Sequence, residues 1–289
     1  MVLLTFFALI GAASAVPFTA RQVEAGPPPG SHTAPSSAPM PDIEAIMSVP
    51  QSAFKSYKQG GLIRGTDYNT TDILKLPKRD GTKDGWVCSD HSTPILTWGD
   101  NDDGGRGIQI TNSGSDWRGF YIYHNTCEYV PWKYIWIAPG ATQFVSFPAL
   151  WEGRVVRGVD SMLNGQAQPL ASWLEIGWDV SDIGWADVSL IRGCDGGILT
   201  WDLGNGNSWK GFTQWVLDGA PGNSYDQKAD GQWVLKATEN WDGSINTDPR
   251  DWELQKIGEQ YVYVDDYHGN PVISSPSRRF GSYWPDGRA

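Results

Sequence analysis

Cysteine and histidine are scarce in this chain: its 289 residues contain three cysteines and four histidines. Three cysteines allow at most one internal disulfide and leave one thiol over, so disulfides are not the main source of stability. The histidines are scattered, without the spacing of metal ligands. They are His32, His91, His124 and His268. We therefore expect no metal site and no cofactor.

Basic residues are also few relative to acidic ones. The chain has 22 Lys and Arg against 33 Asp and Glu, for a net charge of −11. This balance argues against a nucleic-acid partner, because binding a phosphate backbone needs clustered cations. No run after the N-terminus approaches the roughly 20 apolar residues of a membrane span, so we expect none. The G-x-S-x-G, H-E-x-x-H, phosphate-loop and dinucleotide motifs are absent as well.

Tryptophan is absent from the first 85 residues, whereas all 16 lie between Trp86 and Trp284. The composition therefore divides the chain into two unlike parts, and only the second can form a large aromatic core.

The N-terminal part has the composition of a leader and a linker. The apolar run Val2 to Ile10, followed by Ala13-Ser14-Ala15, predicts a signal peptide over residues 1–15 and hence a secreted protein; a buried N-terminal strand is the alternative. Residues 16–85 are rich in Pro, Ala and Ser, which predicts a disordered lead-in, either a linker or a propeptide, with a short helix after Asp42. The sequon at Asn69 predicts glycosylation.

Residues 86–289 carry short runs of β-branched and aromatic residues between Gly, Asn and Asp turns, without a convincing helix. Closely spaced strand signals of this kind predict one all-β sandwich domain, which we expect to be a monomer. The runs are 107–111, 119–123, 134–137, 143–147, 187–191, 213–217, 233–237 and 260–264.

One pattern occurs twice in this part. A cysteine is followed by I-L-T-W and then by W-[RK]-G-F, once from Cys88 and once from Cys194. Because the two cysteines stand at equivalent strand starts, we predict a disulfide between them and a free Cys127. The longer loop of the first copy holds Asp100, Asp102 and Asp103, interpreted as a solvated acidic turn, with a weak cation site as the alternative.

A further set of motifs resembles the core of thaumatin-like proteins and of related β-1,3-glucan-cleaving hydrolases. The motifs are Gly153-Arg154, the nearby Arg157, Leu174-Glu175 and Asp187-Val188-Ser189-Leu190-Ile191. The strand Gly140 to Phe147 also resembles one in secreted fungal allergen-like proteins. The resemblance covers roughly Trp98 to Trp201.

The resemblance implies a thaumatin-like β-sandwich with an acidic cleft. It makes Glu175 the cleft glutamate, Asp187 the aspartate of D-V-S-L, and Arg154, the arginine of G-R, a substrate-binding residue. The chain departs from the pattern in three ways: Gly184 and Arg192 stand where the family has aspartates, and most of the family's cysteines are missing.

The residues themselves allow the same chemistry. Glycosidic cleavage uses two carboxyl groups in different protonation states, here Glu175 and Asp187. The indoles of Trp173, Trp178 and Trp185 are interleaved with them in sequence and can pack on sugar faces. The alternative is structural: the indoles fill a core, and the carboxyl groups cap turns or pair with arginines.

Two functions follow. In the first, a secreted protein binds, or binds and hydrolyses, a cell-wall polysaccharide such as β-1,3-glucan through an acidic cleft flanked by Trp, with Glu175 and Asp187 catalytic. In the second, a non-catalytic secreted effector or allergen-like protein acts on a host cell-surface component. Both functions fit the same fold, so only the geometry and chemistry of the site residues can distinguish them.

Overall fold

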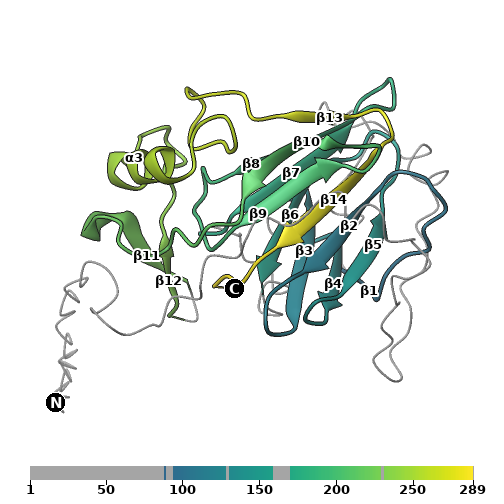
Figure 1. Cartoon of the computed structure of the whole chain (residues 1–289), viewed down its shortest axis with the longest axis horizontal. Coiled ribbons are helices and arrows are strands. Elements are labelled where there is room, and N and C mark those ends of the chain that lie inside the picture. Colours follow the sequence, from purple (N-terminus) through teal and green to yellow (C-terminus); the bar gives the residue numbers. More distant parts are fainter. Residues whose placement is uncertain (1–87, 89–93, 128–129, 159–169, 229–230, 289) are drawn as a thin grey trace, which may run out of the picture.

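The computed structural model describes residues 88, 94–127, 130–158, 170–228 and 231–288 (Figure 1). The predicted signal peptide, the lead-in over 16–85 and the sequon at Asn69 lie outside these residues and stay predictions.

Strands in mixed sheets dominate the described residues, which confirms the all-β class. A seven-stranded sheet has the order β1-β4-β3-β6-β7-β8-β13 and a five-stranded sheet the order β10-β9-β14-β2-β5. The first contains β1 (Ile95–Thr97), β3 (Arg118–His124), β4 (Lys133–Ile137), β6 (Glu152–Gly158), β7 (Trp173–Trp178), β8 (Gly184–Ser189) and β13 (Ile273–Ser275). The second contains β2 (Gly107–Asn112), β5 (Thr142–Ser146), β9 (Ile198–Asp202), β10 (Asn205–Phe212) and β14 (Arg279–Trp284).

Both large sheets contribute side chains to one core. Successive side chains of a strand point to opposite faces, so β7 directs Leu174 and Ile176 inward and Glu175 to the outer face. The same alternation on β8 directs Val188 inward and Asp187 outward. Glu175 and Asp187 therefore share the outer face of the seven-stranded sheet.

A smaller unit lies at one end of the sheets (Figure 1). It comprises β11 (Tyr225–Gln227), β12 (Trp233–Leu235), the 3₁₀ turn η4 (Gly222–Ser224) and α3 (Thr247–Lys256). Asp248 in the first turn of α3 and Lys256 in its last turn complement the helix dipole. In the described part of the chain, no helix has the length and apolar character to span a membrane.

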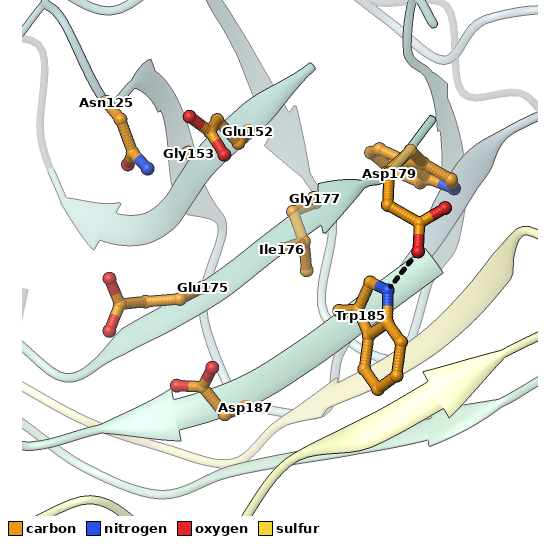
Figure 2. Close-up of a pocket in the computed structure, with 10 residues that line it drawn as sticks. Asn125, Glu152, Gly153, Glu175, Ile176, Gly177, Asp179, Trp185 and Asp187 are labelled. Carbon is orange, nitrogen blue, oxygen red and sulfur yellow. Dashed lines mark hydrogen bonds between the residues drawn. The ribbon is translucent and has the colours of Figure 1, made fainter. Parts of the chain in front are cut away.

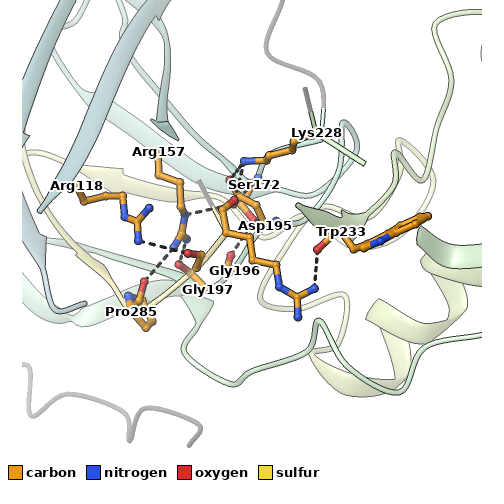
Figure 3. A network of polar contacts seen from close by, with 11 residues as sticks. Arg118, Arg157, Ser172, Asp195, Gly196, Gly197, Lys228, Trp233 and Pro285 are labelled. Carbon is orange, nitrogen blue, oxygen red and sulfur yellow. Dashed lines mark hydrogen bonds and ion pairs between the residues drawn. The ribbon is translucent and has the colours of Figure 1, made fainter. Parts of the chain in front are cut away.

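A buried carboxylate connects this unit with the sheets. Asp195 is fully buried and forms ion pairs with Arg157 (Nε–Oδ1, 3.2 Å) and with Lys228 (Nζ–Oδ2, 2.8 Å) (Figure 3). Lys228 also donates to the carbonyl of Arg288, and Arg157 donates to the carbonyl of Pro285. The network thus joins β6, the residues before β12 and the C-terminal segment.

The predicted Cys88–Cys194 disulfide is wrong. Cys88 is bonded to Cys127, with 5.3 Å between their Cα atoms, and Cys194 is a free thiol. The prediction treated equivalent strand starts as neighbours, but the strands that follow the two cysteines, β1 and β9, belong to different sheets. Cys194 is instead buried in the core, where its backbone pairs with Leu235.

The two copies of the Cys–ILTW pattern are not structural repeats. In the second copy, the strands β9 and β10 pair with each other as a hairpin. In the first copy, β1 and β3 both pair with β4 and not with each other. The longer loop of this copy contains β2, which joins the other sheet.

The interpretation of the acidic loop as a solvated turn is wrong for two of its aspartates. Asp100 is buried and forms an ion pair with Lys133 at 2.6 Å. Asp102 accepts two hydrogen bonds from Arg279, at 2.7 and 2.5 Å. Asp100 and Asp102 therefore pair with basic residues that are distant in sequence, and only Asp103 of the three is exposed.

Candidate functional site

The register of three neighbouring strands brings the predicted site residues into one row. Arg154 on β6 lies opposite Glu175 on β7, which lies opposite Asp187 on β8. Directly opposed residues of antiparallel strands have Cβ atoms about 4.5–5.5 Å apart. The two predicted catalytic carboxyl groups are therefore adjacent.

An open groove of about 290 Å³ lies over this row (Figure 2). Glu175, Asp187 and Trp185 line it, and so do Glu152 and Asp179, which the sequence analysis did not single out as site residues. The remaining lining residues are Asn125, Gly153, Ile176, Gly177 and Trp178.

The absence of a side chain at Gly177 leaves room for the groove. Gly177 lies in register between Glu152 on one side and Trp185 on the other. A Cβ atom at this position would stand 3.1 Å from the Cβ of Glu152 and would narrow the space between the two flanking side chains.

The environment of Asp187 favours its protonated form. Oδ1 of Asp187 is shielded from solvent and has no hydrogen-bond partner. Burial raises the pKa of Asp187 well above its usual range, and the negative charge of Glu175 raises it further. One carboxyl group of the pair thus holds a proton more tightly than an ordinary aspartate.

Arg154 is buried beside the groove and does not line it. Its guanidinium lies 4.1 Å from the ring centroid of Trp173 and 5.0 Å from that of Tyr123. Trp173 is therefore covered by Arg154 and only 8% exposed, so the prediction that its indole faces a substrate is wrong.

The other two tryptophans that were predicted to contact a sugar differ in exposure: Trp178 is buried and Trp185 is exposed. Trp178 points into the core, where it packs against Phe147 and Phe280 and donates from Nε1 to the carbonyl of Arg278 at 3.0 Å. The residue borders the groove but is only 3% exposed, which leaves its indole little surface for a sugar. Trp185 is 44% exposed and donates from Nε1 to Oδ2 of Asp179 at 3.0 Å, which fixes its ring beside the groove (Figure 2).

Tyr263 is a further group near the carboxyl pair. Its backbone pairs with Ser189 in parallel orientation, and its N–H donates to the carbonyl of Val188 at 2.8 Å. Burial raises the pKa of the Tyr263 hydroxyl, as do the charges of Asp187 and Glu175. The hydroxyl donates to Asn270 at 2.7 Å.

Strand alternation could have identified one of the residues that the sequence analysis missed. Glu152 stands two residues before Arg154 on the same strand, and side chains two apart share a face. Asp179 follows β7 in the turn to β8, where it accepts hydrogen bonds from the N–H groups of Ser181 and Ile183. Tyr263 is distant in sequence from the carboxyl pair, and no sequence pattern connects it with them.

The described residues contain no group of three or more His, Cys, Asp or Glu placed to hold a metal ion. A scan against protein-family models found no match, and neither did a search of the curated proteins. What the site can do follows from its own side chains: a carboxyl group with a raised pKa beside a second carboxyl group, next to an exposed indole.

Proposed function

We propose that this chain is a secreted carbohydrate-active protein with a thaumatin-like β-sandwich, whose groove binds a polysaccharide and cleaves its glycosidic bonds. The observation that carries the proposal is the pairing of Asp187, with its raised pKa, and Glu175 in one open groove. The secretory pattern of residues 1–15 supports an extracellular location.

Glu175 and Asp187 are direct neighbours across β7 and β8, with Cβ atoms about 4.5–5.5 Å apart. Retaining enzymes hold their carboxyl groups about 5–5.5 Å apart, so we assign the retaining reaction to this pair. Asp187 donates its proton to the glycosidic oxygen while Glu175 attacks the anomeric carbon, so the C–O bond breaks and a glycosyl ester forms. Asp187 then takes a proton from water, which attacks the same carbon and releases Glu175 as a carboxylate.

The groove wall supplies sugar contacts. The exposed face of Trp185 can pack against the apolar face of a pyranose ring. Glu152 and Asn125 line the groove and offer hydrogen bonds to sugar hydroxyls. A groove of this kind, with an aromatic surface and a few convergent polar groups, is typical of small-ligand sites.

A binding and release assay tests the proposal. The full chain is incubated with insoluble β-1,3-glucan, chitin and cellulose, and both retention and soluble sugar are measured. We expect retention and sugar release on at least one polymer. Glu175→Gln and Asp187→Asn should abolish release without loss of the folded state, because each keeps the shape of its side chain. Retention by none of the polymers, together with no release, contradicts the proposal.

A second candidate is a non-catalytic binder that acts on a host surface as an effector. The buried Arg154 directly opposite Glu175 favours it, because a cation there gives Glu175 a structural role. This candidate predicts retention without sugar release, and loss of stability in Glu175→Gln.

A further inference from the structure

A tryptophan outside the groove is exposed at the tip of a turn. Trp241 is 68% exposed and is not among the residues that line the groove. It is one of four large apolar side chains that are exposed in the described part of the chain, and the others are Val180, Trp185 and Tyr267. The indole of Trp241 contributes little to the core, so most of its surface is available to a ligand.

The turn that carries Trp241 is fixed by its own hydrogen bonds. The N–H of Asn240 donates to the carbonyl of Ser244, and the N–H of Gly243 donates to the carbonyl of Asn240, both at 2.9 Å. The side chain of Asn240 also donates to the hydroxyl of Ser244 at 2.9 Å. The backbone at Trp241 is therefore preorganised, which lowers the entropy that a ligand has to overcome on binding.

Arg192 packs against one face of this indole. Its guanidinium lies 3.9 Å from the ring centroid of Trp241, and its Nη1 donates to the carbonyl of Glu239 at 2.8 Å. Arg192 is also one of the positions at which the chain departs from the thaumatin-like pattern. One face of the indole is thus fixed by the chain, and the opposite face is left to solvent.

The guanidinium restricts what can stack on the open face. A cation there would lie across the ring from Arg192, and the two like charges would repel each other. The attraction of the indole for a cation is already used by Arg192. A neutral ring with a flat apolar face meets no such repulsion, and a pyranose ring has this shape.

The surroundings of Trp241 favour a sugar over a protein surface. Its exposed neighbours on the turn are polar or lack a side chain: Asn240, Asp242, Gly243 and Ser244. None of the other exposed large apolar side chains of the described residues stands on this turn. A protein interface needs an apolar core of several residues within about 1,600 Å², whereas a sugar ring needs one indole face.

We infer that Trp241 is a second sugar-binding platform, outside the groove, for a neutral polysaccharide such as β-1,3-glucan. The inference rests on the proposed function. Trp185, at the groove, is the second residue of β8, whereas Arg192 follows the end of that strand by three residues. The two indoles are therefore connected to opposite ends of β8, and an insoluble polymer can engage both at once. Such double engagement raises the overall affinity above that of either contact.

The test compares retention on an insoluble polymer with cleavage of a short soluble oligomer. The polymers are β-1,3-glucan, chitin and cellulose, and the oligomer is made of the sugar whose polymer retains the parent chain best. We expect Trp241→Ala to weaken retention about tenfold and to cleave the oligomer at the parent rate, because the oligomer needs only the groove. Tyr267→Ala removes another exposed ring, 77% exposed, and should be retained like the parent.

The outcomes separate this inference from the proposed function. If Trp241→Ala is retained as tightly as the parent, the inference is wrong and the proposed function stands. Equal losses of retention and cleavage also overturn it, because the platform would then not be separate from the groove. If the parent is retained but cleaves nothing, retention of Trp241→Ala alone decides. A parent that no polymer retains overturns the inference, and if it also releases no sugar, the proposed function is wrong as well.

Two further variants test how the platform is built. Trp241→Tyr keeps a flat ring and should restore most of the retention that Trp241→Ala loses. Arg192→Gln removes the stacked guanidinium, so we expect about threefold weaker retention in the parent and no further loss in Trp241→Ala, since Arg192 acts through the indole. Equal losses in the two backgrounds would show that Arg192 does not position Trp241.

Discussion

Burial is the main cause of the raised pKa of Asp187, and the charge of Glu175 adds to it. Because the charge of Glu175 contributes to the raised pKa of Asp187, we expect Glu175→Gln to lower that pKa. NMR titration of carbon-13-labelled carboxyl groups measures it directly, without any substrate. Asp251→Asn should leave the titration unchanged. An identical Asp187 pKa in Glu175→Gln would mean that burial alone sets it.

The same pair determines how hydrolysis depends on pH. Cleavage requires Asp187 protonated and Glu175 ionised, so we expect the rate to fall as the pH rises through the pKa of Asp187. The measurement is kcat/KM against pH on the best polymer from the binding assay. A rate that keeps rising through the alkaline range would exclude Asp187 as the acid.

Glu253 predicts a pH dependence of stability that is separate from the groove. It is fully buried on α3, neither carboxyl oxygen has a hydrogen-bond partner, and burial raises its pKa well above the usual range. A folded-state pKa above the unfolded value means that the folded state binds more protons. The stabilisation is present below the unfolded pKa and is lost as pH rises, by about 1.4 kcal/mol per pH unit until the folded pKa is passed.

Glu253→Gln tests this expectation. The amide keeps the shape but does not ionise, so the free energy of unfolding should depend less on pH than in the parent chain. Urea unfolding between mildly acidic and mildly alkaline pH measures the difference. Asp242→Asn, an exposed control, should keep the slope of the parent. Parallel slopes for Glu253→Gln and the parent would show that Glu253 is already ionised in the folded state.

Individual side chains were only partly predictable from the sequence. Alternation along a strand puts Trp173 and Trp178 on opposite faces, because they are an odd number of residues apart. It cannot show that Arg154 covers one of them or that Phe147 and Phe280 enclose the other, since these contacts come from other strands.

At the scale of elements, local patterning predicted several strands well. The expected runs 107–111 and 119–123 match β2 and β3 closely. The runs 213–217 and 260–264 were wrong as strands: both are apolar and partly buried, but the second contributes only an isolated bridge at Tyr263. Apolar and β-branched residues identify segments that pack in the protein interior. Whether such a segment forms a strand depends on hydrogen-bonding partners that are distant in sequence.

The disulfide makes a testable prediction about the elements it joins. The Cys88–Cys127 bridge spans 39 residues of sequence, so Cys88→Ser should lower the free energy of unfolding by about 2–4 kcal/mol. Denaturant unfolding of the oxidised chain and the variant measures it. Cys194→Ala is the control that keeps the bridge.

Thiol labelling followed by peptide mapping tests the pairing itself. We expect only Cys194 to react with a thiol reagent, and only after unfolding, because its thiol is buried. A labelled Cys127 peptide in the oxidised chain would contradict the pairing.

The order of strands in the whole molecule could not be read from the sequence. β14, near the C-terminus, lies between β9 and β2 and is parallel to β2. The Cys–ILTW pattern occurs twice, yet its copies differ in structure because the longer loop of the first copy contains β2, which pairs in the other sheet. Sequence similarity of short segments reports local strand preference and does not determine which distant strand becomes the neighbour.

Asp195 connects the parts of the whole molecule, so its loss should affect stability more than any surface pair. Asp195→Asn removes the charge that balances Arg157 and Lys228 inside the protein (Figure 3). We expect a loss of about 3–5 kcal/mol in the free energy of unfolding, because buried cations are left uncompensated.

Asp182→Asn is the matched control for this variant. Asp182 also lies between two arginines, Arg106 and Arg278, but its side chain is 34% exposed, so water screens the pairs. Its positive φ of 64° is tolerated by asparagine as well as by aspartate. We expect a loss below about 1 kcal/mol. Similar losses in the two variants, measured by denaturant unfolding, would mean that Asp195 contributes no more than a surface pair and that the apolar core alone holds the two-stranded unit against the sheets.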